Sequence, residues 1–151
     1  MIAAQMDADN SKLIIQTLGR FDVIKEGSSL VMSSSGSKKL WELFKFMLTH
    51  RDRSFTPETL MDQLWVSETY SDPRSTLRRQ MHRLRQSLAE EDAGDQLNTI
   101  RFTNGYYKWN ETLDFEIDID LFERLIKQGD AYMVTAPQKA LDYYLEALSY
   151  Y

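Results

Sequence analysis

Residues 72–88 read DPRSTLRRQMHRLRQSL, and this stretch decides the fold because it has the pattern of one helix with two different faces. Asp72 followed by Pro73 is typical of a helix start, where a capping side chain precedes a proline in the first turn. At about 100° per residue, the apolar side chains share one narrow stripe of the helix surface. They are Leu77, Met81, Leu84 and Leu88. The stripe predicts that the helix packs against a protein core along one side only.

The charged side chains of the same helix gather beside the apolar stripe. The segment holds five arginines, no lysine and one acid. A guanidinium group carries a rigid fork of donors that fits phosphate oxygens and the O6/N7 edge of guanine. We therefore expect this helix to contact DNA. The expected contacts are Arg74, Ser75, Arg78, Arg79, His82, Arg83 and Arg85. The alternatives are a charged face that meets only solvent and, for Arg85, an ion pair inside the domain.

The segments before this helix predict a β-meander and two further helices. Short β-prone runs broken by Gly and Ser, at 13–18, 21–25 and 30–32, are typical of a small antiparallel meander. Residues 38–50 follow the helical period, and Thr56-Pro57-Glu58 starts a second, shorter helix. Two helices followed by the arginine-bearing helix match the order of a helix-turn-helix domain.

The segments after it predict a β-hairpin. Asn104-Gly105 lies between two strand-like runs, 97–102 and 106–109, and an Asn-Gly turn in this setting is a strong hairpin signal. A hairpin at this place in the chain is the wing of a winged helix. Its candidate DNA contacts are Arg101, Asn104 and Lys108.

Two helical patterns follow, at 120–133 and 137–151. The second is expected to bury Leu141, Tyr144, Leu145 and Leu148. The sequence thus predicts an α+β fold: a winged helix-turn-helix with an N-terminal antiparallel β-meander and a wing hairpin, followed by an all-α helix pair. The expected parts are a disordered tail at 1–12, a winged-helix domain at 13–110, an acidic linker at 111–117 and the helix pair at 118–151.

Charge is unevenly distributed along the chain. The formal net charge is −5 and the pI is about 5.0, which alone would argue against a nucleic-acid partner. Residues 111–151, however, hold nine acids and three bases, so the acidity belongs to this segment. Because the field at a surface is set mainly by its nearest charges, the arginine-bearing helix can still attract an anion.

Several classes of function are disfavoured. The chain has no cysteine and two histidines, so neither a zinc site nor thiol catalysis is expected. It has no phosphate-binding glycine loop and no nucleophile elbow, so we expect no enzyme activity and no cofactor. The acids at 114–120 lack the glycine and terminal glutamate of a calcium loop and are interpreted as part of a solvated linker. No apolar run reaches the roughly 18–20 residues that span a bilayer, and a cytoplasmic protein is expected.

Five segments, in order, resemble the winged helices of OmpR/PhoB-type response regulators. They resemble still more closely the antibiotic-pathway regulators of the SARP type, in which a winged helix precedes a bacterial transcriptional activation domain built from tetratricopeptide-like helix pairs. The segments are 37–48, 56–65 with its Leu-Trp ending, 75–88 with its Arg-Leu-Arg core, 103–107 with its Gly-Tyr pair, and 118–125. Tyr107 departs from the pattern, because a basic residue often follows Gly-Tyr in the family.

The resemblance implies sequence-specific binding to double-stranded promoter DNA, with residues 72–91 in the major groove and a homodimer on repeated half-sites. The N-terminal half of the helix is expected to go deepest into the groove, while Arg83 and Arg85 are better placed for phosphates. The family also implies recruitment of RNA polymerase, activation of transcription, and a truncated activation domain at 118–151. A different interpretation stays open: a protein-interaction module, made of a winged helix plus a helical repeat, that does not bind DNA directly.

Overall fold

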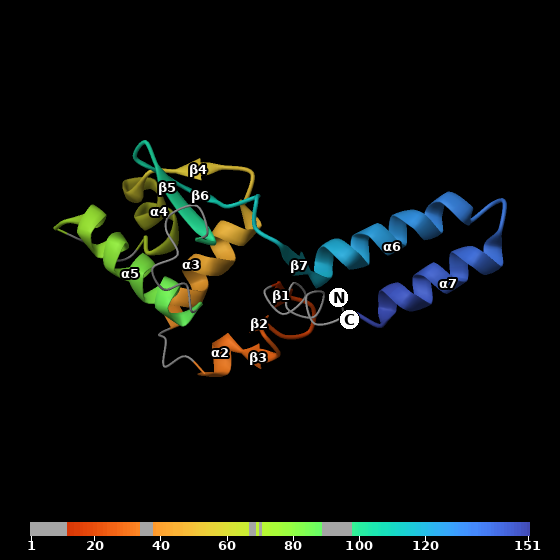
Figure 1. Ribbon diagram of the computed structural model, residues 1–151. Helices are drawn as coiled ribbons and strands as arrows, with labels where there is room; N and C mark the ends of the chain where they lie inside the picture. The colour runs from red at the N-terminus through yellow and green to blue at the C-terminus, as the bar shows by residue number, and fades with distance from the viewer. Residues whose placement is uncertain (1–11, 34–37, 67–68, 70, 89–97) are drawn as a thin grey trace. The chain divides into compact units, whose positions relative to one another are not determined.

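The computed structural model describes residues 12–33, 38–66, 69, 71–88 and 98–151 of the chain (Figure 1). The chain forms two compact units. The first combines the chain up to Leu30 with Asp114–Tyr151, and the second consists of Val31–Leu113. These units differ from the expected division into 13–110 and 118–151, since the N-terminal strands group with the C-terminal helices.

The first unit contains a four-stranded sheet in the order β3-β2-β1-β7. The strands are β1 (Leu13–Gln16), β2 (Asp22–Lys25), β3 (Ser28–Ser29) and β7 (Phe115–Ile117). β1 pairs antiparallel with β2 and parallel with β7, so that Ile15 lies between Val23 and Ile117. All three side chains are buried, which gives the sheet one packed face.

Two expectations for these segments are wrong. Residues 30–32, expected as a strand, belong to the short helix α2 (Leu30–Ser33), and the third strand is the two-residue β3 before it. The expected linker at 111–117 contains β7. The partner of β7 is β1, about a hundred residues earlier in the chain, and a pairing over such a separation leaves no local signal in the sequence.

Asp118, expected in the solvated acidic segment, is instead a buried structural residue with 8% of its surface exposed. It begins helix α6 (Asp118–Tyr132). Its carboxylate accepts hydrogen bonds from the backbone N–H groups of Thr17, Leu18 and Ile119 and from the Thr17 hydroxyl, over distances of 2.6–2.9 Å. The carboxylate thereby joins the end of β1 to the start of α6.

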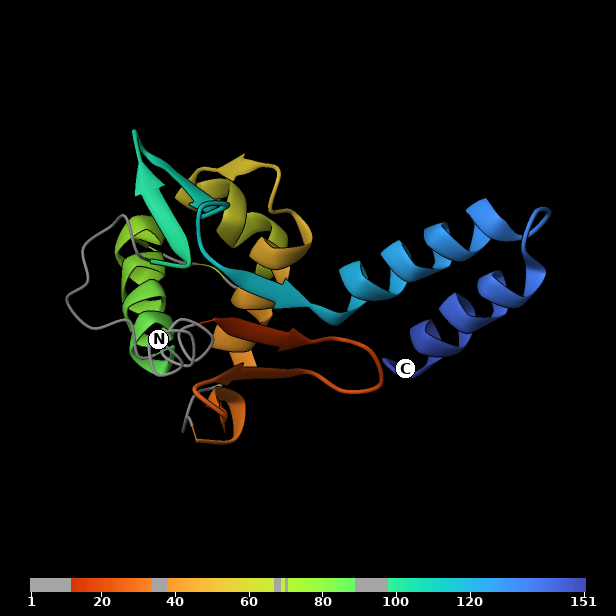
Figure 2. The same ribbon diagram turned by 45° about the vertical axis from the view of Figure 1, so that its right-hand side comes forward.

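Helix α6 and helix α7 (Pro137–Leu148) lie side by side and run in opposite directions (Figure 2). The small side chains Ala140 and Ala147 of α7 are buried. Three larger side chains that the pattern predicted to be buried are exposed: Leu141 by 46%, Leu145 by 56% and Leu148 by 62%. Because small residues at a contact let two helices approach closely, the wider apolar residues of α7 are left outside the pair.

Gly129 of α6 lies against the ring of Tyr144 on α7. A Cβ atom added to Gly129 would lie 2.5 Å from Cε1 and 2.8 Å from Cδ1 of that ring. The Tyr144 hydroxyl donates a hydrogen bond of 2.6 Å to Asp130, which holds the ring in place. We expect Gly129→Ala to lower the free energy of unfolding, measured by urea denaturation, although alanine is about 1 kcal/mol better than glycine in a helix interior.

The control for this prediction is the same substitution without the ring. In a Tyr144→Ala background, Gly129→Ala should raise the free energy of unfolding by about 0.5–1 kcal/mol, since only the helix propensity remains. A stabilising Gly129→Ala in the presence of Tyr144 would show that the ring does not constrain this position.

The second unit packs three helices against a three-stranded sheet (Figure 1). The helices are α3 (Lys38–Thr49), α4 (Pro57–Leu64) and α5 (Pro73–Ser87), and the sheet has the order β4 (Ser54–Phe55), β6 (Tyr106–Trp109), β5 (Ile100–Thr103). In the core, Phe44 of α3 is fully buried and meets Trp109 edge to face, with 5.4 Å between ring centroids. This contact fixes the sheet against the helices.

The order of helices and hairpin in this unit confirms the predicted winged helix. Asn104 and Gly105 join β5 to β6 with φ values of 55° and 84°, both in the left-handed region that a tight hairpin turn of this sequence requires. Strand β4 was not expected, because Ser54 and Phe55 lie in the polar connection between two helices. Phe55 is buried and lies opposite Tyr107. Burial of the Phe55 side chain therefore places this connection at the edge of the sheet.

None of the helices in the described ranges is long and apolar enough to cross a membrane.

Candidate nucleic-acid interface

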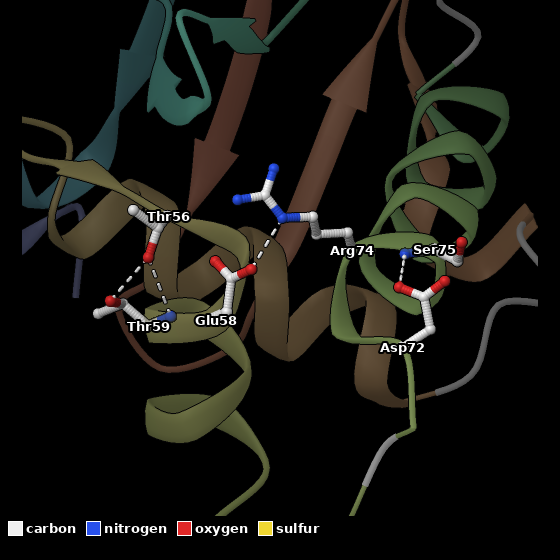
Figure 3. Close-up of polar contacts among 6 residues, drawn as sticks. All are labelled: Thr56, Glu58, Thr59, Asp72, Arg74 and Ser75. Carbon is white, nitrogen blue, oxygen red and sulfur yellow. Dashed lines mark hydrogen bonds and ion pairs between the residues drawn. The ribbon is translucent and has the colours of Figure 1, made fainter.

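The start of α5 is fixed by capping. The carboxylate of Asp72 accepts a hydrogen bond of 3.2 Å from the backbone N–H of Ser75 (Figure 3). Hydrogen bonds from the side chain and the backbone of Ser75 lower the pKa of Asp72 below its usual value. Ser75, a candidate DNA contact, therefore already helps to start the helix.

The apolar stripe of α5 is buried as the sequence predicted. Leu77, Met81, Leu84 and Leu88 are each exposed by 1% or less. Burial of four such side chains holds the helix firmly in the unit, at about 1.5–3 kcal/mol for each large apolar side chain. The orientation of the remaining faces follows from this stripe.

Four of the expected contacts are exposed side chains of α5. Arg78, Arg79, His82 and Arg83 are exposed, and no ion pair joins any of them to another residue in the described ranges. Since they lie at spacings of three and four residues, they form one continuous surface of three guanidinium groups and one imidazole along the helix. We call these four residues the cationic row.

Arg74, at the start of the same helix, is already paired. Its Nε lies 2.8 Å from Oε1 of Glu58, near the start of α4, and the two side chains are 63% and 48% exposed (Figure 3). The hydrogen bond that its carboxylate accepts from its own backbone N–H, and then the hydrogen bond from Arg74, lower the pKa of Glu58, so its carboxylate is ionised at neutral pH. The pair offsets the charge of Arg74 but leaves the guanidinium accessible.

Arg85 holds the wing to the helix. It is half-buried, and its Nη2 donates a hydrogen bond of 3.0 Å to the backbone carbonyl of Ile100 on β5. The sequence left open an internal ion pair for Arg85, whereas its internal partner is a backbone carbonyl. Arg85 therefore contributes to the placement of the wing, and its position is less open than that of the cationic row.

Tyr107 lies on the face of the wing that meets α5. Burial raises the pKa of its hydroxyl, and the positive charges of Arg85 and Arg78 oppose this shift. The family often has a basic residue at this position, but here the side chain is buried in the core of the unit.

The three wing candidates occupy two different places. Asn104 is exposed at the hairpin turn. Arg101 and Lys108 lie directly opposite each other on β5 and β6, both half-buried. Since Ile100, Tyr107 and Trp109 form the buried face of the hairpin, Arg101 and Lys108 lie on the other face, away from the core.

Sequence reasoning missed Glu58 as part of this surface. Its position after Thr56-Pro57 indicated only a helix start. Its pairing with Arg74 depends on how α4 and α5 pack, and the two residues are 16 positions apart.

Removing the charge of Glu58 should strengthen binding to duplex DNA. In Glu58→Gln, Arg74 keeps a hydrogen-bond acceptor but loses the opposing charge, so its full positive charge becomes available to a phosphate. We expect a higher affinity for random duplex, with the log–log salt slope steeper by up to about 1. Fluorescence anisotropy at several salt concentrations measures both, and Glu123→Gln on α6 is the matched control. An affinity that is unchanged or lower would mean that Arg74 does not face the nucleic acid.

The comparisons with known proteins agree with this architecture. Residues 33–107 match the family model for "Transcriptional regulatory protein, C terminal". A solved structure, Mycobacterium tuberculosis EmbR in complex with a low affinity phosphopeptide, is similar in fold with a TM-score of 0.68 and 18% sequence identity. The similarity covers 93% of this chain and 36% of EmbR, so the chain spans about a third of the length of that protein. No curated protein sequence matches the chain. Residues 33–107 of this chain thus belong to the C-terminal domain family of transcriptional regulatory proteins, the OmpR/PhoB-type winged helices.

Proposed function

We propose that this chain binds duplex DNA in a sequence-specific way through α5, as the DNA-binding part of a transcription regulator. The observation that carries the proposal is the cationic row, four exposed side chains that form no ion pair with any other described residue, beside a fully buried apolar stripe. An arginine row on a free helix face has no evident use in stabilising the unit, and it has the donors that a major groove and its flanking phosphates require.

The members of the row differ in the role we assign to them. Arg78 lies in the second turn of α5, and its positive charge acts on the hydroxyl of the wing residue Tyr107. We assign it to a base edge, with guanine the best match for its donor fork. Arg79 and Arg83 lie further round the helix and are assigned to phosphates, and His82 to either. Ser75 and Arg74, at the exposed N-terminal end, are secondary contacts.

The role of the wing is limited in this proposal. Asn104 at the tip is the wing residue assigned to the DNA backbone. Arg85 contributes through the placement of the hairpin. Arg101 and Lys108 face away from the core side on which α5 lies, so we do not assign them to the same groove contact.

The family suggests further properties for the whole protein. We propose that it acts in the cytoplasm on promoter DNA, binds repeated half-sites as a homodimer, recruits RNA polymerase and activates transcription. These proposals rest on the transcription-regulator family of residues 33–107.

Salt dependence tests DNA binding directly. If about six to eight phosphates are contacted, the logarithm of the association constant should fall with the logarithm of salt concentration at a slope of roughly −5 to −7. Anisotropy titration with a random duplex gives the slope, and selection of bound oligonucleotides from a random pool gives the preferred site. Absence of salt-sensitive binding at low salt would refute the proposal.

A protein-interaction function is the second candidate, and one observation favours it. The exposed apolar side chains Leu141, Leu145 and Leu148 lie on α7, where a protein surface could cover them. The two functions concern different units and are compatible. A chain that binds no duplex at low salt, but whose leucine substitutions change its association state, would favour the second function alone.

A further inference from the structure

Arg74 differs from the cationic row because a carboxylate already holds its guanidinium group. Its Nε donates a hydrogen bond of 2.8 Å to Oε1 of Glu58, and Figure 3 shows the two terminal nitrogens projecting past this contact. The described residues give these two nitrogens no hydrogen-bond partner. The side chain of Arg74 is 63% exposed. The contact with Glu58 therefore leaves the outer edge of the guanidinium, with two parallel donors, open to a ligand.

Both partners of this contact lie at the start of a helix that is capped. Thr56 caps α4, where its hydroxyl accepts a hydrogen bond of 3.2 Å from the backbone N–H of Thr59, and Glu58 follows in the first turn. The Glu58 carboxylate also accepts a hydrogen bond from its own backbone N–H. Asp72 caps α5 two residues before Arg74. An arginine that is ordered in advance loses less rotamer freedom on binding, so Glu58 prepares Arg74 for a directed contact.

The charges at this end of α5 are unfavourable for a phosphate. Glu58 and Asp72 are both exposed, and hydrogen bonds lower the pKa of each carboxyl group. A phosphate is attracted by the local net charge, and Arg74 paired with Glu58 has none. The edge of a base carries no formal charge and is recognised by the positions of its donors and acceptors. A neutral pair with two open donors is therefore suited to a base edge.

We propose that Glu58 is a positioning residue that sets sequence specificity, because it makes Arg74 a reader of one guanine. Arg74 is the second residue of α5, and the first residues of a recognition helix are those that contact base edges. The O6 and N7 acceptors of guanine match two parallel donors of a guanidinium. The inference rests on the proposed binding of duplex DNA by α5. It adds a second guanine to the one assigned to Arg78 and gives Glu58 a role that requires no contact with DNA.

The replacement of one atom in the DNA tests the contact of Arg74. The preferred site of the full chain is selected from a random pool, and 7-deazaguanine then replaces each guanine of that site in turn. This analogue keeps the base pair and the O6 acceptor but lacks N7. In fluorescence anisotropy titrations, the analogue should weaken binding about fivefold at the guanine that Arg74 reads. Arg74→Ala should abolish this loss at that guanine and leave the losses at other guanines unchanged.

The role of Glu58 is tested by the preference for this guanine, measured as the ratio of affinities for the selected site and for the same site with adenine there. Arg74→Ala and Arg74→Lys should both lower the ratio about tenfold, since lysine keeps the charge but not the fork. Glu58→Ala should lower it about threefold, the modest effect expected of an exposed ion pair, and should raise the affinity for random duplex. In an Arg74→Ala background, Glu58→Ala should leave the ratio unchanged. Glu123→Gln on α6, with the same change in net charge, is the control.

The results distinguish failure of this inference from failure of the proposed function. A chain without salt-sensitive duplex binding overturns both. If the chain selects a site but Arg74→Ala weakens all duplexes equally, Arg74 is a phosphate contact, so the proposed function stands and the inference is overturned. If Arg74→Ala lowers the ratio while Glu58→Ala does not, Arg74 reads guanine unaided and the role of Glu58 is overturned.

Discussion

Replacing Arg78, Arg79 and Arg83 together by glutamine is expected to weaken binding to duplex DNA by at least about 100-fold. Each of these side chains is exposed, and none of them forms an ion pair with another described residue. Their loss therefore removes contacts to DNA without breaking contacts inside the protein. At about 1 kcal/mol or more for each contact, three losses sum to about 3 kcal/mol or more, and every 1.4 kcal/mol corresponds to about a tenfold change in affinity.

Single substitutions in the cationic row should separate a loss of sequence-specific binding from a loss of general affinity for duplex DNA. Arg78→Ala is expected to cost about 1–3 kcal/mol on the selected site and to relax the sequence preference, because a base contact discriminates between sequences. Arg83→Ala should weaken all duplexes about equally and make the salt slope shallower by about 1, because a phosphate contact releases counterions without reading sequence. Anisotropy titrations with the selected site and a scrambled duplex measure both effects.

The matched control is Arg124→Gln, which removes an exposed arginine from α6 in the other unit. It changes the net charge of the chain by the same amount as Arg78→Ala or Arg83→Ala, so it separates a local effect from a general one. Circular dichroism and thermal unfolding should be the same for all variants, since the cationic row contributes nothing to the core. Duplex affinity that survives the triple substitution would exclude α5 as the DNA-binding helix.

Sequence periodicity predicted the two faces of α5 because both are properties of a single helix. The apolar stripe must meet a core, and the neighbouring face is then oriented by geometry alone. The partners of Arg74 and Arg85 could not be predicted in the same way. One lies on another helix and the other is a backbone carbonyl on a strand, so both depend on tertiary packing.

The errors elsewhere have a similar origin. Strands β4 and β7 are too short to show alternation, and each forms only because a longer strand offers hydrogen-bonding groups along its edge. On α7, the pattern identified the apolar residues but not which of them face α6. Ala140 and Ala147 are buried there, and Leu141, Leu145 and Leu148 are exposed. Which residues are buried depends on the distance between α6 and α7.

Asp118 is expected to show the largest effect on stability. It is almost fully buried, and both carboxylate oxygens accept hydrogen bonds, from Thr17, Leu18 and Ile119. Asp118→Ala leaves several buried donors without an acceptor, at about 1–3 kcal/mol each, and should lower the free energy of unfolding by about 3–5 kcal/mol in total. Urea denaturation measures the loss.

The decisive comparison is Asp118→Asn, which keeps the size and one oxygen. The amide replaces one acceptor by a donor that faces other donors, so this variant should still lose about 2–3 kcal/mol of stability. Hydrogen exchange should show loss of protection at the Thr17 and Leu18 amides, while α5 in the other unit keeps its protection. Glu123→Gln, an exposed acid on the same helix, should change stability by less than about 0.5 kcal/mol. An asparagine variant as stable as the original chain would mean that the packing of α6, and not the carboxylate of Asp118, holds the start of this helix to the end of β1.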